Sequence, residues 1–342
     1  MRYRSLGRTG IKVSPYALGA MMFGVIGNSD HAESIRIIHR ALDAGINLID
    51  TADVYSRGES EKIVGEALLD RRADVVLATK ARMPMGDEPN HQGASRRWLV
   101  RALEDSLRRL STDYVDVYQI QRPDPETDIE ETLSALTDLQ RAGKIRAFGT
   151  SSLPASDIIR AHWVSERRGL GRLRTEQPAY SILNRGIERE VLPVAQEFGM
   201  GTLVWSPLGG GLLTGRYRKG QQADTHRSQF GFQHLKDDRR LDVVEQLIPL
   251  AGEAGMPLTH LAMAFVLAHP GVTSALIGPR TMAHLEDLLA GADTALDDDL
   301  LDRIDKIVPP GTDIGTLDMA YQPPAITHTQ RWRRPLEERS AS

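Results

Sequence analysis

Cysteine is absent from the 342-residue chain, and its absence removes several kinds of chemistry together. Without thiols there is no disulfide framework, no thiolate metal site and no cysteine nucleophile. Long apolar runs are also missing, since none approaches the roughly 20 residues that a membrane-spanning helix needs. The first residues, MRYRSLGR, lack the apolar core of a secretory signal. We therefore expect a cytoplasmic protein that does not enter a membrane.

An excess of positive charge is missing too. Lysine and arginine together number 42 against 46 acidic residues, a net charge of −4. General nucleic-acid binders are usually basic, so nucleic acid is not an expected partner. The ten histidines include no His-x-x-x-His pair on a predicted helix, and no thiolates stand beside them. This pattern argues against a metal site.

What the sequence does contain is a regular alternation of short apolar runs and longer amphipathic runs. The short runs are near-continuously apolar, as is typical of parallel strands buried on both faces. A polar-apolar stretch with a Gly-containing turn at residues 3–13 precedes them and predicts a β-hairpin. The predicted strands are Tyr16–Ala20, Ile46–Asp50, Asp74–Thr79, Tyr114–Ile120, Ile145–Thr150, Arg174–Gln177, Gly201–Trp205 and Ser274–Ile277.

Helical periodicity fills the intervals between these strands, with apolar residues at three- and four-residue spacing. The predicted helices are His31–Ala44, Ser95–Leu110, Asp128–Ala142, Pro154–Arg167, Ile187–Phe198, Leu241–Ala254 and Thr281–Ala290, with two extra helices at Pro257–Ala268 and Asp297–Ile307. Such alternation predicts a parallel sheet, either a closed (β/α)8 barrel or an open doubly wound sheet. Eight strands and an unbroken rhythm favour the TIM barrel as one domain over residues 1–342, with the barrel at about 14–308.

Two segments do not follow this rhythm. Residues 206–240 form a stretch too long for an ordinary connection, which indicates a functional or mobile segment. Residues 309–342 have little periodicity, so they are either a disordered tail or a segment folded over a site.

Polar residues interrupt the apolar pattern at one recurring place, the carboxyl end of each strand. In a barrel these ends meet on the face that carries the active site. The residues concerned are Asp50, Lys80, Gln121, Ser151, Gln177, Trp205, Ser206 and the Gly278–Thr281 turn.

Three residues near this face form a coherent acid-base device. Tyr55 follows Asp50 by five residues, and a free tyrosine has a pKa near 10 and is a poor acid at neutral pH. A lysine ammonium such as that of Lys80 stabilises the phenolate and lowers this pKa. Asp50 would keep the lysine charged and oriented. The set could protonate a carbonyl oxygen as hydride arrives.

Nucleotide-binding signals are present, although the Gly-x-Gly-x-x-Gly fingerprint is not. Gly209, Gly210 and Gly211 would let backbone amides approach a pyrophosphate, or simply begin a flexible loop. The turn at Gly278 opens a helix whose first amides can hold an anion, and Arg280 beside it suits a phosphate. Trp205 could stack on a planar ring or pack in the core.

Taken together, these strings resemble the aldo-keto reductase family. The resemblance runs in order from about residue 3 to residue 308. It rests on residues 48–61 (LIDTADVYSRGESE), 113–120 (DYVDVYQI), 143–151 (GKIRAFGTS), 176–177 (EQ), 205–209 (WSPLG) and 278–281 (GPRT). The opening hairpin, the barrel and the two extra helices also agree with this family. The resemblance implies NADPH-dependent carbonyl reduction, and it leaves room for a homo-oligomer.

The resemblance also assigns roles to individual residues. It implies that Asp50, Tyr55 and Lys80 are catalytic, with Tyr55 as the acid. Ser151 and Gln177 would bind the nicotinamide amide, and the Trp205 ring would stack on the nicotinamide. The implied cofactor-binding set is completed by Ser206, Leu208, Gly209, Gly210, Gly211, Gly278, Arg280, Thr281 and His284.

One departure from the family pattern bears directly on the reaction. The fourth catalytic residue of the family is a histidine, in a His-x-Pro-Asp-like string, and here the string reads QRPD from Gln121. A glutamine amide can donate a hydrogen bond to a carbonyl oxygen but cannot titrate. Three explanations remain open: a natural variant that is still a reductase, a natural variant with a changed or nucleotide-sensing role, and an introduced histidine substitution. At a neighbouring position, Ser152 stands where many members have asparagine.

The sequence therefore predicts a reductase that transfers hydride from NADPH to an aldehyde or ketone. In this interpretation Tyr55 donates the proton, Lys80 and Asp50 adjust the acidity of Tyr55, and Gln121 helps to hold the substrate carbonyl. Two alternatives accompany it because of Gln121. One is a nucleotide-sensing regulatory subunit of the kind that related barrels provide to ion channels, and the other is a reductase of activated carbon–carbon double bonds.

Overall fold

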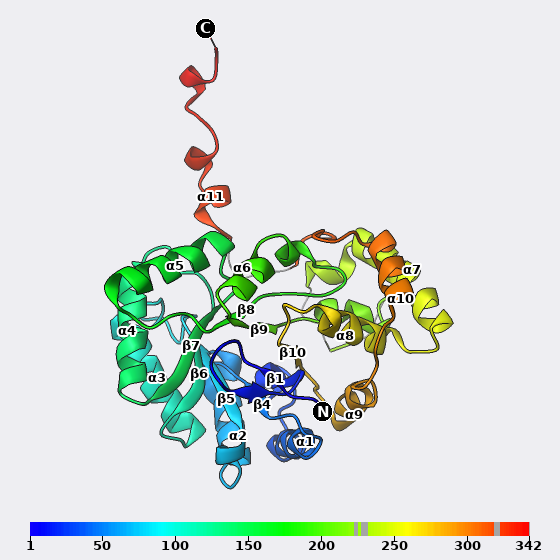
Figure 1. Cartoon of the computed structure of the whole chain (residues 1–342), viewed down its shortest axis with the longest axis horizontal. Coiled ribbons are helices and arrows are strands. Elements are labelled where there is room, and N and C mark those ends of the chain that lie inside the picture. The colour runs from blue at the N-terminus through cyan, green and yellow to red at the C-terminus, as the bar shows by residue number, and fades with distance from the viewer. Residues whose placement is uncertain (222–224, 227–231, 318–321, 342) are drawn as a thin grey trace.

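The fold is built on a closed barrel of eight parallel strands (Figure 1). The computed structural model describes residues 1–221, 225–226, 232–317 and 322–341. Each strand pairs with the next in the order β10-β3-β4-β5-β6-β7-β8-β9, and β9 closes the ring on β10. The predicted (β/α)8 barrel is confirmed, and the open sheet is wrong. The strands are β3 (Tyr16–Gly19), β4 (Leu48–Asp50), β5 (Val76–Ala81), β6 (Val115–Ile120), β7 (Ile145–Ser151), β8 (Thr175–Gln177), β9 (Gly201–Val204) and β10 (Ser274–Ile277).

Helices surround this barrel, and local sequence signals fix several of their ends. The Asp30 and Asp128 side chains each accept a hydrogen bond from a first-turn amide of the helix that follows, as N-caps do. The helices are α1 (His31–Asp43), α2 (Glu59–Ala67), α3 (Arg96–Leu110), α4 (Ile129–Arg141), α5 (Ala155–Arg168), α6 (Val191–Glu197), α7 (Asp238–Glu253), α8 (Leu258–Ala268), α9 (Met282–Ala290), α10 (Asp298–Ile307) and α11 (Pro324–Thr327). The periodicity did not predict α2.

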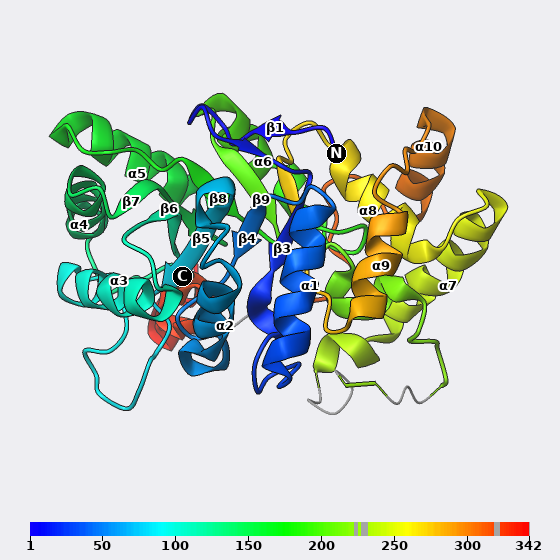
Figure 2. The same cartoon turned by 90° about the horizontal axis from the view of Figure 1, so that it is seen from below.

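The predicted hairpin at the start of the chain is confirmed. Its strands β1 (Arg4–Ser5) and β2 (Lys12–Val13) pair antiparallel, and the hairpin lies across one end of the barrel (Figure 2). Gly7 has a φ of +55°, and a Cβ there would come within 2.5 Å of the Gly199 carbonyl oxygen. The turn can therefore approach the start of β9 this closely because residue 7 has no side chain.

Apolar side chains fill the part of the barrel interior next to this hairpin. We call this set the amino-terminal layer. It combines three residues of the hairpin and β3 with one residue from each of four further strands. Its members are Leu6, Val13, Ala17, Leu48, Ala78, Val117 and Leu203, and all are fully buried. The hairpin and this layer close the amino-terminal end of the barrel.

The last part of the chain divides into two sections. Ile314 donates a backbone hydrogen bond to the Leu183 carbonyl, so residues leading to Leu317 run along the barrel. Helix α11 and the exposed residues after it stand away from the barrel (Figure 1). Among the described residues, no single helix has the length and apolar character to cross a membrane; α7 and α8 reach that composition only as a pair bent by 94°.

Candidate functional site

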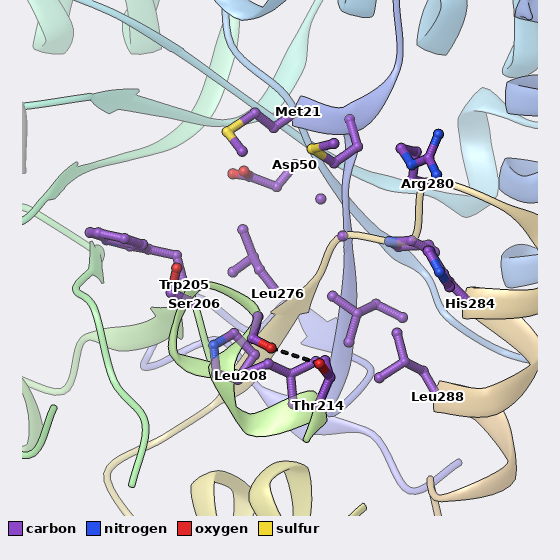
Figure 3. A pocket seen from close by; sticks show the side chains of 18 of the residues that line it. Met21, Asp50, Trp205, Ser206, Leu208, Thr214, Leu276, Arg280, His284 and Leu288 are labelled. Carbon is purple, nitrogen blue, oxygen red and sulfur yellow. Dashed lines mark hydrogen bonds between the residues drawn. The ribbon is translucent and has the colours of Figure 1, made fainter. Parts of the chain in front are cut away.

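A cavity of about 660 Å³ opens at the carboxyl ends of the barrel strands (Figure 3). Of the sixteen site residues that the sequence singled out, fourteen line this one cavity. Gly209 and Thr281 do not line it. The Thr281 hydroxyl instead caps α9 by accepting a hydrogen bond from the His284 amide. The fourteen are Asp50, Tyr55, Lys80, Gln121, Ser151, Gln177, Trp205, Ser206, Leu208, Gly210, Gly211, Gly278, Arg280 and His284.

The Lys80 ammonium lies at the centre of the acid-base group. Its Nζ donates to Asp50 Oδ2 at 2.5 Å and to the Thr51 carbonyl at 2.9 Å, and it lies 3.4 Å from Tyr55 Oη. Lys80 and Asp50 are each 1% exposed, so this ion pair is shielded from water. Strands β4 and β5 are neighbours, which explains why residues thirty apart in the sequence meet here.

Two amides hold the other oxygen of Asp50. Gln177 Nε2 donates to Asp50 Oδ1 at 2.8 Å, and Gln119 Nε2 lies 3.4 Å from the same oxygen. Both carboxylate oxygens are therefore engaged, as a buried charge requires. The carboxylate is fixed in place and in turn fixes the direction of the lysine.

Electrostatics keep this lysine positively charged. Burial disfavours the ammonium, but Asp50 and Tyr55 more than offset this effect, and the pKa of Lys80 lies above its ordinary value. Close by, burial and the neighbouring Glu61 raise the pKa of Asp53 well above its usual range. Asp53 is therefore biased toward the neutral acid, and Asp50 is the carboxylate that balances Lys80.

A strained turn presents Tyr55 to the cavity. Ser56 and Arg57 follow it with φ values of +48° and +54°, the left-handed region that side chains other than glycine rarely adopt. The Ser56 hydroxyl is buried and donates to the Phe23 carbonyl at 3.2 Å. This contact ties the turn to the segment after β3. Strain of this kind persists where the surroundings fix it, often at functional sites.

Three consecutive glycines follow β9, and the second and third of them line the cavity. Gly209, Gly210 and Gly211 have φ values of +58°, +71° and +109°. A Cβ at Gly210 would come within 2.4 Å of His234 Nε2. The chain therefore needs glycine here on conformational grounds, and backbone without side chains lines the cavity at Gly210 and Gly211.

At the end of the cavity beside α9, the two cations Arg216 and Arg280 outnumber the carboxylate of Asp287. Arg280 and His284 lie next to each other there (Figure 3). Burial, together with Arg216 and Arg280, lowers the pKa of His284. Within the described part of the chain neither Arg216 nor Arg280 forms an ion pair with a carboxylate. The N-terminus of α9 adds its partial positive charge, so this end suits an anion.

Comparison with known proteins identifies the family of the chain. The model of the aldo/keto reductase family matches residues 16–309. Three relatives illustrate its range. An uncharacterized oxidoreductase, YrpG, from Bacillus subtilis is 38% identical over 320 residues, covering 90% of this chain and 96% of YrpG. The aldo-keto reductase YhdN of the same bacterium is 39% identical, covering 84% and 88%. A probable voltage-gated potassium channel subunit beta from rice is 36% identical, covering 90% and 97%.

The chain belongs to the aldo/keto reductase family. This membership confirms the resemblance carried by the sequence motifs and supports an oxidoreductase. The relatives include both a protein named as an aldo-keto reductase and one named as a channel subunit.

Gln121 follows β6 directly and lines the cavity. Its backbone amide donates to the Ala81 carbonyl at 3.0 Å, which continues the β5–β6 pairing and brings the side chain to the cavity. Gln121 Oε1 is buried, and it has no hydrogen-bond partner among the described residues. An unsatisfied buried amide oxygen is costly, so this group is suited to a ligand that supplies a donor.

Other cavity residues were not identified from the sequence. Met21 and Met22 follow β3, Arg216 and Tyr217 lie in the long segment after β9, and Leu317 precedes the tail. The sequence had marked residues 206–240 and 309–342 as segments that could serve the site, but no local pattern singled out these individual side chains. Arg122 also lines the cavity, and its only signal was its place directly after Gln121.

Proposed function

We propose that this aldo/keto reductase uses NADPH to reduce the carbonyl group of an aldehyde or ketone to an alcohol. The observation that carries the proposal is the position of Lys80 Nζ between Asp50 and Tyr55 in the cavity wall. A tyrosine beside a buried, charged lysine leaves a phenolate that the lysine charge stabilises when it gives up its proton. It is therefore suited to giving a proton to a carbonyl oxygen.

Four side chains of the site have separate roles in the proposed reduction. The Tyr55 hydroxyl transfers its proton to the substrate oxygen, and Lys80 stabilises the phenolate that remains. Asp50, held by Gln177 and Gln119, keeps the lysine charged. The Gln121 amide donates a hydrogen bond to the same carbonyl oxygen, which orients the substrate and polarises it without titrating. When bound, NADPH supplies the hydride.

The cavity fits such a nucleotide. Gly210 and Gly211 line the cavity without side chains, and Arg216 and Arg280 place positive charge at the far end beside His284. Trp205 offers a flat ring at the other end. The guanidinium of Arg280, which forms no ion pair with a carboxylate of the described residues, supports a preference for NADPH over NADH, because the extra phosphate of NADPH would meet it. Equal affinities for the two nucleotides would overturn that part of the proposal.

Replacing Tyr55 with phenylalanine tests the mechanism. We expect Tyr55→Phe to lower turnover by about 10²- to 10⁴-fold, because the proton donor is lost and the ring is kept. The measurement is NADPH oxidation with a panel of aromatic aldehydes, diketones and sugar ketones, with NADPH affinity determined in parallel. If the variant keeps full turnover while it binds NADPH normally, the mechanism is wrong.

A second candidate function rests on Gln121. A regulatory subunit that senses the nucleotide would bind NADPH tightly and turn over negligibly, and the relatives include a probable potassium channel subunit beta. Gln121→His separates the cases. Turnover by the unmodified protein supports the reductase. Turnover only in the variant indicates that the scaffold is competent and that Gln121 silences it. Product analysis distinguishes an alcohol from a reduced carbon–carbon bond.

A further inference from the structure

The charged side chains that line the cavity lie at its two ends, and one of them, Asp287, is a carboxylate close to His284. At one end, Arg216 and Arg280 flank His284. At the other end, beside Tyr55 and Trp205, Asp50 and Lys80 neutralise each other as an ion pair. Arg122 remains. Its guanidinium carbon lies 5.5 Å from the centre of the Trp205 ring, so a net positive charge stands at the end where the carbonyl would react.

Arg122 has few protein partners for a guanidinium with five N–H donors. Its Nη1 donates to the Gln121 carbonyl at 2.8 Å and lies 3.4 Å from both the Ser151 and the Ser152 hydroxyl oxygens. Its Nε is buried and has no hydrogen-bond partner among the described residues. Arg122 also forms no ion pair with any described carboxylate. A partly buried cation without a counter-charge destabilises the protein unless a ligand supplies the negative charge and the missing hydrogen-bond acceptors.

The ionisable groups around Arg122 do not cancel its charge. Tyr55 and Glu176 are the nearby acidic groups, and Arg82 adds a second cation. Glu176 is fully buried and already accepts hydrogen bonds from the Thr150 hydroxyl and the Leu153 amide. Burial raises its pKa to about 7, so it carries little charge below neutral pH.

We propose that Arg122 forms an anion subsite beside the reacting carbonyl, and that the substrate is an aldehyde or ketone that also carries a carboxylate. A guanidinium can donate two parallel hydrogen bonds to one carboxylate, and this pair fixes the orientation of the ligand as well as its affinity. The carboxylate would accept hydrogen bonds from the Arg122 N–H groups, while the Tyr55 hydroxyl and the Gln121 amide face the carbonyl. This subsite deepens the proposed reduction and rests on it.

Matched acid and ester pairs test the subsite by turnover. The pairs are 3- and 4-carboxybenzaldehyde and succinic semialdehyde, each beside its neutral methyl ester. We expect kcat/KM to favour the acid in at least one pair by about 10- to 100-fold, the range for hydrogen bonds to a charged group. Arg122→Gln should lower kcat/KM for that acid about 10- to 100-fold more than for its ester. Arg122→Lys should recover part of the preference, since it keeps the charge without the planar fork.

Arg216→Gln is the matched control, because it removes a cavity arginine at the other end. We expect it to raise the KM for NADPH and leave the acid-to-ester ratio as it is. The subsite is overturned if no acid is preferred, if Arg122→Gln lowers acid and ester equally, or if its main effect is on the KM for NADPH. Circular dichroism and thermal unfolding check that each variant is folded.

A binding measurement separates failure of the subsite from failure of the proposed reduction. Benzoate and neutral benzamide are titrated into the full-length protein saturated with NADP⁺, by calorimetry. We expect benzoate to bind at least about 10-fold more tightly, and Arg122→Gln to remove the difference. If no aldehyde is reduced and benzoate still shows this dependence, the subsite stands and the proposed function falls. If benzoate binds no better than benzamide, the subsite falls.

Discussion

The two ends of the barrel interior are equally buried and have opposite chemistry. On β4, Leu48 belongs to the amino-terminal layer and Asp50, two residues later, belongs to the site. Because strand side chains repeat with a period of two, both point to the same side of the strand. The pattern recurs on the next strands, where the apolar and polar partners are Ala78 and Lys80 on β5, and Val117 and Gln119 on β6.

Within a single set of strands, the apolar layer stabilises the fold and the polar layer forms the site. Apolar burial in the amino-terminal layer stabilises the fold by about 25 cal/mol for each Å² removed from water. The buried ion pair and amides of the other layer contribute little net stability, because their desolvation opposes their attraction. The apolar burial at the amino-terminal end of the same strands offsets the desolvation cost of the polar groups in the site.

The largest expected effect comes from breaking the polar layer. Lys80→Met leaves Asp50 buried without its counter-charge. We expect unfolding free energy to fall by about 3–5 kcal/mol and turnover to fall by about 10²- to 10⁴-fold. Urea unfolding and NADPH oxidation measure the two effects.

The double variant Asp50→Leu/Lys80→Met is the control for this effect. Replacing both partners with apolar groups should restore most of the lost stability and none of the activity. A double variant as unstable as Lys80→Met alone would contradict our view that the uncompensated charge is responsible.

The next effect comes from the amino-terminal layer. Leu6→Ala removes a fully buried side chain between the hairpin and β9, and we expect a loss of about 2–5 kcal/mol in unfolding free energy. Leu6→Ile, which keeps the volume, should cost about 1.5 kcal/mol or less. The kcat of the folded protein should not change in either variant. A large fall in kcat at unchanged folding would show that the layers are not independent.

The smallest effect is a pH dependence that lies outside the site. Burial, with Arg172 and Arg174 nearby, lowers the pKa of His162 to about 4, and the ring stacks on Phe198. The unfolded value is near 6.5, so its contribution to stability is complete above that pH and is lost as pH falls toward 4. We expect a loss of about 1–2 kcal/mol, allowing for solvent screening.

Unfolding of His162→Leu between pH 4 and 8 measures this contribution. The variant should lose less stability than the parent as pH falls from 6.5 to 4. Glu176 has a raised pKa, so its contribution is complete below about pH 4.5 and is lost as pH rises to about 7. That opposite slope remains in both proteins and cancels in the difference. Identical curves would exclude His162 as the source.

The sequence predicted the barrel because each strand and most helices carry their own periodic signal. Helix α2 gave no such signal, since part of its buried face is polar. Ser60 and Glu61 are fully buried, with the Ser60 hydroxyl donating to the Ala20 carbonyl and Glu61 held by Thr79 and Arg109. A search for apolar spacing cannot find a helix whose inner face is made of hydrogen bonds and an ion pair.

Much of the candidate site was also predictable, because polar residues at strand ends stand out against apolar strands. Arg122 was not, since its adjacency to Gln121 does not reveal that its guanidinium approaches Trp205. Thr281 shows the converse. It lies within a recognisable string, but its hydroxyl faces the backbone of α9 and not the cavity.

Closure of the ring by β3 and β10 also has a consequence during synthesis. Strand β3 leaves the ribosome early, while β10, which covers one of its edges, is made only after most of the chain. Until then the growing sheet has an unpaired edge, and such edges are where nascent chains pair wrongly or aggregate. Variants near β10 should therefore lower the yield of folded protein in the cell more than their equilibrium stability suggests. Pulse-labelled solubility, compared with urea unfolding of the purified variants, would measure that difference.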